Sequence, residues 1–209
     1  MPVDHPAPHK ALLIDLDGVL RRWSSTGTEI ERACGLPSGA IQTAAFEHSL
    51  LHAAVTGRIS DEHWRERVVA LLRRSYPQAR AFEAVTAWST PLGEVDVDVL
   101  RIVQRAAKRL RIVLVTNATT RLNRDLESLG LKDSLDVVVN SSEIGIAKPE
   151  SGFYVAALRA ANVGAAETLY ADDSRANVDA ATKLGIHSHH FNGHEALASF
   201  LAQHRIVDG

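Results

Sequence analysis

Residues 10–20 read KALLIDLDGVL, and this stretch decides the fold. Its apolar run ALLI is typical of a strand that is covered on both faces of a parallel sheet. The run ends in two carboxylates, Asp15 and Asp17, and Gly18 lets the chain turn sharply after them. Two such carboxylates repel each other and are costly to bury, and a hard cation such as Mg²⁺ would relieve both costs. The pair also suits a nucleophile and a proton carrier, although a plain strand end with a polar turn fits this motif alone equally well.

The composition is that of an ordinary globular chain. Its 209 residues are 45% hydrophobic and 23% charged, with a net charge of −2, which predicts one or two domains with a normal core. The pairs Arg21-Arg22 and Arg73-Arg74 are interpreted as solvated faces. Because no strongly basic surface is expected, no nucleic-acid partner is predicted.

The single cysteine and the first residues bear on the compartment. Cys34 alone excludes an internal disulfide and a cysteine zinc site, which is typical of a reducing environment. The opening MPVDHPAPHK lacks the apolar core of a secretory signal, and no apolar run reaches the length of a membrane span. We therefore expect a cytoplasmic protein with no membrane partner.

A block of helices is predicted directly after the first strand. Its clearest helix has Ser60 as N-cap and ends before Pro77, and the others rest on apolar residues at helical spacing. The expected helices cover residues 29–33, 41–51, 61–76 and 79–88. We expect a helical domain of residues 21–94 inserted into a core of residues 1–20 and 95–209, with hinges at 20–23 and 91–95.

From residue 95 onward, predicted strands and helices alternate. This order is typical of a Rossmann-like α/β core, a doubly wound parallel sheet with helices on both faces. In such sheets ligands bind beyond the carboxyl ends of the strands. The expected strands are 11–14, 112–115, 137–139, 168–171 and, at an edge, 187–191.

Polar residues follow four of these strands. They supply carboxylates for a metal, a hydroxyl and amides for phosphate oxygens, and a cation, which is the set that phosphoryl transfer needs. Each one alone is more simply a helix cap or a solvated charge, but their coincidence at ordered strand ends favours a site. The residues are Asp15, Asp17, Thr116, Asn117, Lys148, Asp172 and Asp173.

The four stretches DLDGV, VTN, GIAKPE and YADDSRAN resemble the motifs of the haloacid dehalogenase superfamily, in the same order and context. The helical block resembles the C1-type cap of that superfamily. The segments TGRISDEHW and IGIAKPESGFY are similar to those of its small sugar-phosphate phosphatases and of the phosphatase domain of epoxide hydrolases. The resemblance implies a Mg²⁺-dependent phosphatase that acts on a small phosphorylated metabolite.

The resemblance also implies how the aspartates divide the work. Asp15 would attack phosphorus to give an aspartyl phosphate, and Asp17 would protonate the leaving oxygen and later activate water. Asp15, the backbone carbonyl of Asp17, and Asp173 would hold Mg²⁺. Asp172 would orient Lys148 or a water on the metal, although either Asp172 or Asp173 could be the direct ligand.

The remaining motif residues are implied to hold the phosphate. Thr116 and the backbone amide of Asn117 would bind its oxygens. Lys148 would neutralise charge between the nucleophile and the phosphate.

Three other functions compete with the phosphatase. A hydrolytic dehalogenase would leave Asp17 without a task, because a halide needs no proton. A phosphomutase shares both aspartates and requires a cap that keeps water from the aspartyl phosphate. A non-catalytic ligand-binding member of the same fold is the third. The physiological substrate and the oligomeric state are not predicted.

We expect residues 21–94 to form a lid over the strand ends that closes on small substrates. His48 and His52 are four residues apart and should share a helix face. The simpler interpretation places Trp64 in the lid core and both histidines in solvent; it is favoured for Trp64, and for His52 the two interpretations fit equally well. The side chains expected to reach the substrate are Trp23, His48, His52, Arg58 and Trp64.

Overall fold

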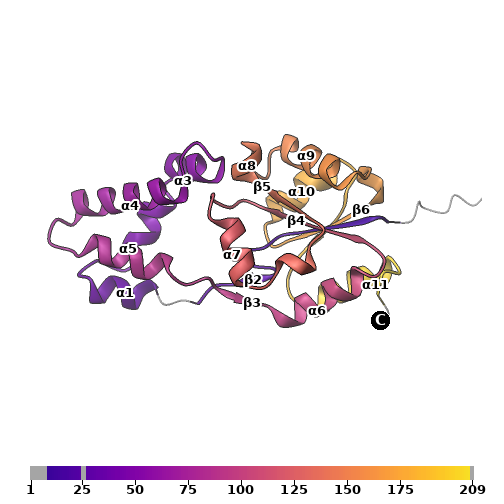
Figure 1. Cartoon of the computed structure of the whole chain (residues 1–209), viewed down its shortest axis with the longest axis horizontal. Helices are drawn as coiled ribbons and strands as arrows, with labels where there is room; N and C mark the ends of the chain where they lie inside the picture. The colour runs from indigo at the N-terminus through magenta and orange to yellow at the C-terminus, as the bar shows by residue number, and fades with distance from the viewer. Residues whose placement is uncertain (1–8, 25–26, 208–209) are drawn as a thin grey trace, which may run out of the picture.

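The computed structural model describes residues 9–24 and 27–207, and a five-stranded parallel sheet lies at its centre (Figure 1). The strands lie in the spatial order β5-β4-β1-β6-β7, so the first strand of the chain is the middle of the sheet. This arrangement confirms the predicted α/β fold with a doubly wound parallel sheet. The strands are β1 (Ala11–Ile14), β4 (Arg111–Thr116), β5 (Val137–Asn140), β6 (Thr168–Asp172) and β7 (His187–His190).

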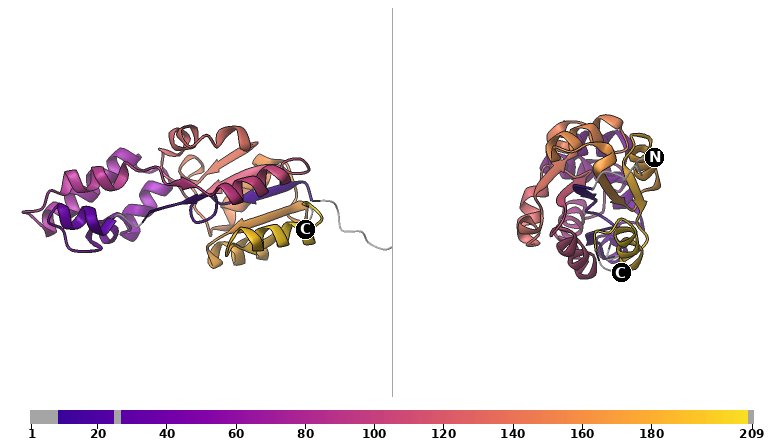
Figure 2. Two further views of the ribbon diagram at one scale, coloured as in Figure 1. Left: turned by 90° about the horizontal axis from the view of Figure 1, so that it is seen from below. Right: turned by 90° about the vertical axis from the view of Figure 1, so that its right-hand side faces the viewer.

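Strand β1 is buried on both faces because helices cover both sides of the sheet (Figure 2). Leu12 and Ile14 belong to one apolar core, and Ala11 and Leu13 belong to the other. Alternate side chains of a strand point to opposite faces, so this place requires an apolar residue at every position. The first core is completed by α6 (Val97–Ala106), α7 (Leu122–Ser128) and α11 (His194–Gln203), and the second by α8 (Ser141–Ile144), α9 (Ser151–Ala161) and α10 (Arg175–Lys183). Short 3-10 turns at Lys132–Ser134 and Ala165–Glu167 precede β5 and β6.

The direction of winding reverses beside β1. The chain passes from β1 through β4 to β5 on one side and then returns to β6 and β7 on the other. Ligands of open α/β sheets bind outside the carboxyl ends of the strands at such a reversal. Asp15 follows β1 directly and Asp172 ends β6, so both residues lie at this point.

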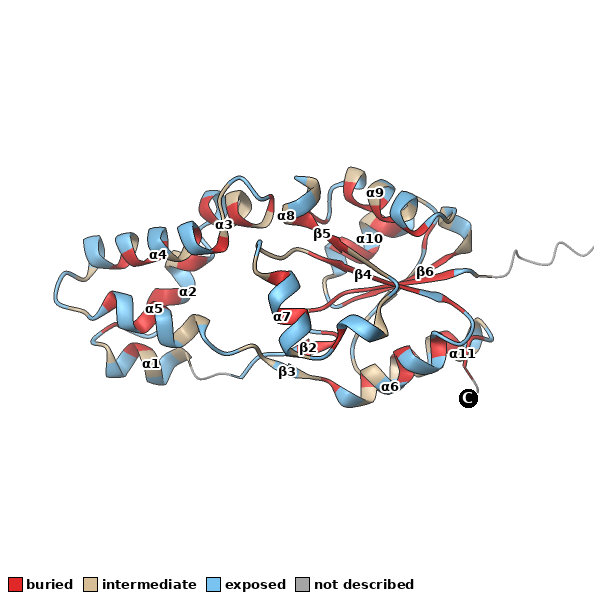
Figure 3. Cartoon of the chain, viewed as in Figure 1, coloured by how far each residue is buried: buried red, intermediate tan, exposed pale blue. Residues whose placement is uncertain are grey.

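Within the described residues, five helices are inserted between the short strands β2 (Arg21–Arg22) and β3 (Glu94–Val95), and they lie beyond the carboxyl ends of the strands of the large sheet (Figure 1). They have an apolar core of their own, which includes Trp64, Val68 and Leu72, and Figure 3 shows their buried residues facing one another. The chain enters and leaves them through an antiparallel ribbon of β2 (Arg21–Arg22) and β3 (Glu94–Val95), which falls in the two stretches predicted as hinges. The helices are α1 (Gly27–Ala33), α2 (Ala40–Ala45), α3 (His48–Val55), α4 (Asp61–Ser75) and α5 (Ala81–Ser89). We call residues 21–94 the helical insertion.

One predicted helix of the insertion is wrong. Residues 41–51 do not form a single helix, because the chain breaks between α2 and α3 at Phe46 and Glu47. The Glu47 carboxylate accepts hydrogen bonds from the backbone N–H of Ser49 at 3.2 Å and of Leu50 at 2.8 Å. Glu47 thus caps a new helix in the middle of an apolar pattern that is continuous in the sequence.

The predicted exposure of the two arginine pairs is wrong at one residue. Arg22, Arg73 and Arg74 are exposed as expected, but the side chain of Arg21 is only 5% exposed. Arg21 is buried because carboxylates on two different elements bind it, as described below.

No helix within residues 9–24 and 27–207 is long and apolar enough to cross a membrane.

Candidate active site

An ammonium group lies between two carboxylates at the strand ends. The Nζ of Lys148 is 2.8 Å from Asp15 Oδ1 and 2.7 Å from Asp172 Oδ2, and it donates to the carbonyl of Val115 at 3.0 Å. Asp15, Lys148 and Asp172 are all buried. Each of the three ammonium protons therefore has an acceptor, and the charge of Lys148 is fixed in place.

The Asp172 carboxylate has no lone pair left for another partner. Its Oδ2 accepts from Lys148 and from the Tyr170 hydroxyl, and its Oδ1 accepts from the backbone N–H of Ser174 at 2.8 Å and from Asn177 Nδ2 at 3.0 Å. Four donors saturate a carboxylate. Asp172 thus binds the same ammonium group that contacts Asp15.

Burial dominates the electrostatics of this group. It raises the pKa of the Asp15 carboxyl to about 7, with Lys148 opposing the rise and Asp172 adding to it. Burial alone would lower the pKa of Lys148, but the carboxylates of Asp15 and Asp172 outweigh it and raise that pKa. Because two carboxylates share one ammonium, the site keeps an excess of negative charge.

Asp173 adds a third carboxylate to this excess. Ligand oxygens of Asp15, Asp172 and Asp173 all lie within 4.8 Å of one another. Burial raises the pKa of Asp173, and the neighbouring Asp172 carboxylate raises it further. Gly18 lies so close that a β-carbon on it would be 2.0 Å from Asp173 Oδ2, so only glycine allows this approach. A group of oxygen ligands with unbalanced negative charge fits a hard divalent cation.

The Asp17 carboxylate is not part of this acidic group. It pairs with Arg21, whose Nε is 2.7 Å from Oδ1 and whose Nη2 is 2.9 Å from Oδ2, and the Trp23 indole N–H donates to Oδ1 at 2.7 Å. The two-point contact with a guanidinium fixes the plane of the carboxylate. The Asp17 side chain is still 39% exposed, so it is held in one orientation and remains accessible.

Asn117 joins the end of β4 to the loop that carries Lys148. Its Nδ2 donates to the Lys148 carbonyl at 2.9 Å, and its Oδ1 accepts from the Lys148 backbone N–H at 2.8 Å. Thr116, the last residue of β4, is buried beside it. The structure therefore brings Asp15, Thr116, Asn117, Lys148 and the paired aspartates of β6 to one edge of the sheet.

A cavity of about 590 Å³ lies between these strand ends and the helical insertion. Of the residues predicted to reach a substrate, Trp23 and Trp64 line it, together with Asp17 and Asn117. Trp64 is also lid core, as interpreted, because it is 8% exposed and its indole N–H donates to the Ala45 carbonyl at 3.1 Å.

Three residues predicted to contact the substrate do not line this cavity. His48 and His52 stack on one face of α3, with ring centroids 6.2 Å apart. Arg58 is exposed and also lies outside the lining. The shared helix face of the two histidines is as expected, but the break before α3 sets where that face points.

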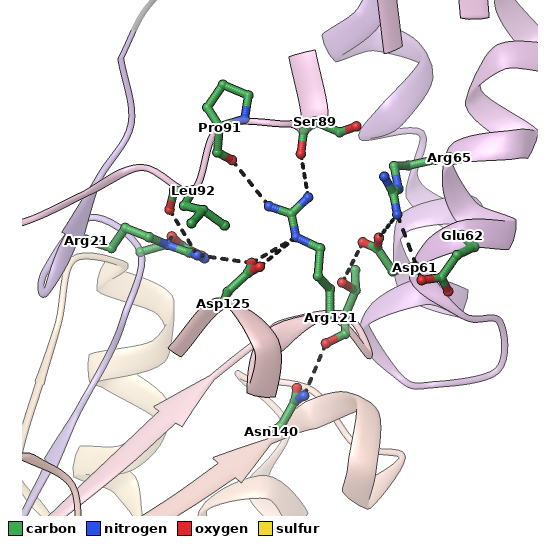
Figure 4. A network of polar contacts seen from close by, with 12 residues as sticks. Arg21, Asp61, Glu62, Arg65, Ser89, Pro91, Leu92, Arg121, Asp125 and Asn140 are labelled. Carbon is green, nitrogen blue, oxygen red and sulfur yellow. Dashed lines mark hydrogen bonds and ion pairs between the residues drawn. The ribbon is translucent and has the colours of Figure 1, made fainter. Parts of the chain in front are cut away.

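Sequence reasoning missed a network that joins both hinges through α7 (Figure 4). The Asp125 carboxylate accepts from Arg121 Nε at 2.9 Å and lies 3.5 Å from Arg21 Nη1. Arg121 also donates to the carbonyls of Ser89 and Pro91 at the second hinge. The spacing of four residues between Arg121 and Asp125 is a signal for a helical ion pair, but no local signal connects Arg21 with Asp125.

A second contact holds the insertion to the core (Figure 4). The Asp61 carboxylate accepts from the Thr119 hydroxyl at 2.8 Å, and the Asp61 backbone N–H donates to the Thr120 hydroxyl at 3.0 Å. Asp61 begins α4, and the two threonines follow β4. The first turn of α4 is thus fixed to the loop that follows Thr116 and Asn117.

Comparison with known sequences places the chain among hydrolases. A model of haloacid dehalogenase-like hydrolases matches residues 9–185. A phosphoglycolate phosphatase from Yersinia pestis is 24% identical over 184 residues, which are 88% of this chain and 68% of that protein. Acyl-CoA dehydrogenase family member 10 from mouse is 28% identical over 191 residues, which are 86% of this chain but only 18% of the mouse protein. The chain thus spans less than a fifth of that relative.

Solved structures share the fold. A haloacid dehalogenase family enzyme from Bacteroides thetaiotaomicron, in complex with magnesium and inorganic phosphate, is similar with a TM-score of 0.72 and 22% identity, over 87% of this chain and 93% of that one. The L-2-haloacid dehalogenase from Xanthobacter autotrophicus, with chloropropionic acid covalently bound, is similar with a TM-score of 0.66 and 22% identity, over 95% and 84% of the two chains. From the match over residues 9–185, the chain belongs to the haloacid dehalogenase-like hydrolase family.

Proposed function

We propose that this hydrolase is a Mg²⁺-dependent phosphatase that cleaves small phosphate monoesters through an aspartyl phosphate. The observation that carries the proposal is the arrangement of Asp15 and Asp17. Asp15 is buried beside the Lys148 ammonium at 2.8 Å, whereas Asp17 faces the cavity, held by Arg21 and Trp23. One carboxylate is placed to attack and the other to move a proton.

The reaction has two steps. An Asp15 oxygen forms a bond to phosphorus while the bond from phosphorus to the ester oxygen breaks, and that oxygen takes the proton from Asp17. Asp17, now a carboxylate, then takes a proton from a water whose oxygen attacks the phosphorus of the aspartyl phosphate. Inorganic phosphate leaves, Asp15 is regenerated as a carboxylate, and Asp17 is again protonated.

The chain's own residues fit Mg²⁺. Because the lone pairs of Asp172 are all used, Asp15 and Asp173 are the carboxylates that would hold the ion, with the backbone carbonyl of Asp17 as a third ligand. Bound Mg²⁺ would neutralise the excess negative charge here and polarise the phosphoryl group.

The other motif residues hold the transferred phosphoryl group in this proposal. Lys148 offsets the charge that builds up between Asp15 and the phosphate, and Thr116 with the backbone amide of Asn117 binds phosphate oxygens. The helical insertion acts as a C1-type cap that encloses the substrate. Its own apolar core and its attachment through the ribbon of β2 and β3 support this division of the chain.

The dehalogenase reading explains less of the site. A dehalogenase releases a halide, which needs no proton, and Asp17 would then be a carboxylate oriented by two side chains for no chemical step. The phosphoglycolate phosphatase among the relatives also favours phosphate over halide chemistry.

The test is phosphate release from a panel of small monoesters by the purified protein, with Mg²⁺ and with excess chelator. We expect turnover that requires Mg²⁺ and is not restored by Ca²⁺, because Ca²⁺ has longer bonds and more ligands. The second part of the test measures halide release from a panel of 2-haloacids, also with Mg²⁺ and with excess chelator. Halide release that persists in chelator, without phosphate release, would overturn the proposal.

A further inference from the structure

The cavity beneath the helical insertion carries more negative than positive side chains. Carboxylates and guanidiniums both line it, but the carboxylates outnumber the guanidiniums, and no lysine or histidine is among the described lining residues. Arg65 pairs with Asp61 at 2.6 Å from outside the lining, so one carboxylate of the lining keeps an unbalanced charge that would repel an anionic group on a ligand. The charged lining residues are Asp17, Glu31, Asp61 and Asp125, against Arg21 and Arg121.

Both guanidiniums are already paired with carboxylates of the chain itself. Arg21 donates hydrogen bonds to Asp17, to Asp125 and to the Leu92 carbonyl (Figure 4). Arg121 donates hydrogen bonds to Asp125 and to the carbonyls of Ser89 and Pro91. A substrate carboxylate or second phosphate would have to share these guanidiniums with the carboxylates that already balance their charge.

Glu31 keeps a charge that no described cation balances. Its buried carboxylate accepts from the backbone N–H groups of Gly39 and Ile41, at 2.8 Å each, and it forms no ion pair with a described residue. Backbone donors stabilise the carboxylate without cancelling its charge. The insertion side of the cavity is therefore negative.

Aromatic rings also line the cavity. Trp64 and Trp88 contact each other with centroids 5.8 Å apart, and both line the cavity. Trp23 is 49% exposed next to Asp17, with the Arg21 guanidinium 4.5 Å from its ring centroid. These rings offer flat apolar surface beside the group that protonates the leaving oxygen.

We propose, on the basis of the phosphatase function above, that the substrate is a monoester of an uncharged ring with a flat apolar face. A volume of about 590 Å³ suits a small molecule of this kind. Aromatic alcohols and sugars share this chemistry. A leaving group that carries a carboxylate or a second phosphate is rejected, in contrast to the substrate named by the phosphoglycolate phosphatase relative.

The first experiment compares substrates that differ by one carboxylate. The pairs are phenyl phosphate with 4-carboxyphenyl phosphate, and 2-hydroxyethyl phosphate with phosphoglycolate. We expect kcat/KM to fall by about 10-fold or more when the carboxylate is present, since an unpaired charge must be desolvated near like charges. Comparison of kcat/KM for a hexose phosphate with that for phenyl phosphate distinguishes a sugar leaving group from an aromatic one.

The second experiment adds a cation to the cavity. Gln42, an exposed residue of α2, lines the cavity, whereas its neighbour Thr43 does not. Gln42→Lys should raise kcat/KM for 4-carboxyphenyl phosphate relative to phenyl phosphate by about 10-fold. Thr43→Lys, which adds the same charge outside the cavity, should leave the ratio unchanged.

The third experiment removes a ring. Trp88→Ala should lower kcat/KM for phenyl phosphate more than for 2-hydroxyethyl phosphate. Phe82→Ala, on the same helix but outside the cavity, is its control and should change neither.

The outcomes separate the two proposals. Equal kcat/KM within each pair, or a preference for the carboxylated member, overturns the substrate class while the phosphatase function stands. An unchanged ratio in Gln42→Lys overturns it as well. No phosphate release from any ester of the set overturns the function itself, and the substrate class with it.

Discussion

The two halves of the site differ in how their residues are held. The inner half, Asp15 with Lys148 and Asp172, is buried in the core and has nearly every polar atom paired. The outer half, Asp17 with Arg21 and Trp23, lies where the chain leaves the sheet for the helical insertion, and its partners reach to both hinges.

In the proposed mechanism, the two halves have different tasks. The inner half handles the phosphoryl group, which every monoester shares, and can be rigid because its target never changes. The outer half handles the leaving group, which differs between substrates, and lies where the chain enters and leaves the insertion. Substitutions in the inner half should therefore affect all substrates equally, whereas those in the outer half should affect them unequally.

The largest effect is expected from Asp15→Asn, which removes the attacking oxygen anion and keeps its shape. Turnover should fall by about 10⁴-fold or more for every ester, while circular dichroism shows a retained fold. Asp133→Asn, an exposed change elsewhere, is the control. Activity within about tenfold of the parent would show that Asp15 is not the nucleophile.

Lys148→Met should combine a kinetic and a stability loss. It leaves Asp15 and Asp172 buried without their shared cation, which costs about 3–5 kcal/mol in the free energy of unfolding. We expect kcat to fall by about 10²–10³-fold, equally for alkyl and aryl esters. Denaturant unfolding and steady-state kinetics provide the two readouts, with the exposed Lys183→Met as control. An unchanged unfolding midpoint would contradict the buried ion-pair account.

Asp17→Asn should separate leaving groups. Alkyl phosphates need a proton on the departing oxygen, so their single-turnover transfer rate should fall by about 10²–10⁴-fold. The single-turnover transfer rate of p-nitrophenyl phosphate should fall much less, because its phenolate leaves unprotonated. Equal losses would mean that Asp17 does not act as the acid.

Arg21→Ala should reproduce this pattern more weakly, because Arg21 acts on the proposed reaction by positioning Asp17. The pH profile of kcat should shift together with the ratio of alkyl to aryl rates, and Arg21→Lys should restore part of the loss. Arg22→Ala, an exposed neighbour, is the control. A uniform loss in all substrates with no change of profile would indicate a purely structural role.

The smallest effect concerns pH and the stability of the metal-free protein. Because the folded-state pKa of Asp15 is raised to about 7, the folded state binds more protons than the unfolded state between about pH 4 and 7. The Asp15 contribution to unfolding free energy must therefore fall as pH rises through this range. Asp15→Asn should melt higher than the parent without metal, by more at pH 7 than at pH 5.

Histidine rings also titrate in this pH range. The comparison of Asp15→Asn with the parent removes their contribution to the change in Tm. Burial lowers the pKa of His9, His189 and His204, so their contribution has the opposite sign and is lost as pH falls below about 6.5. They are common to both proteins and cancel in the difference of Tm. A difference that shrinks from pH 5 to pH 7 would contradict the buried charge at Asp15.

The inner half could be predicted from the sequence because each of its residues ends or follows a strand. Parallel strands bring their carboxyl ends to one edge, so local patterns at Asp15, Thr116 and Asp172 fix a common place in space. Lys148 follows the third predicted strand less directly, in the stretch GIAKPE, and its role is implied by the resemblance to a family motif.

The outer half could be predicted only in part. Arg21 binds Asp125 across 104 residues, and no periodicity encodes that distance. The break at Glu47 depends on two hydrogen bonds that outweigh a continuous apolar pattern, and it decides where His48 and His52 lie. Cap side chains are placed by tertiary packing, which a single sequence does not show.

The central claim is that Asp15 carries the phosphoryl group, and one measurement tests it most directly. Asp17→Asn retains the nucleophile but lacks the base for hydrolysis, so reaction with p-nitrophenyl phosphate and Mg²⁺ should accumulate the covalent intermediate. After acid quench and digestion with pepsin, mass spectrometry should find the mass of one phosphoryl group on the peptide that covers residues 10–20, where Asp15 is then the only carboxylate side chain. The Asp15→Asn/Asp17→Asn double variant should show none. Release of p-nitrophenolate with that peptide unmodified, or with the phosphoryl group on another residue, would contradict the account.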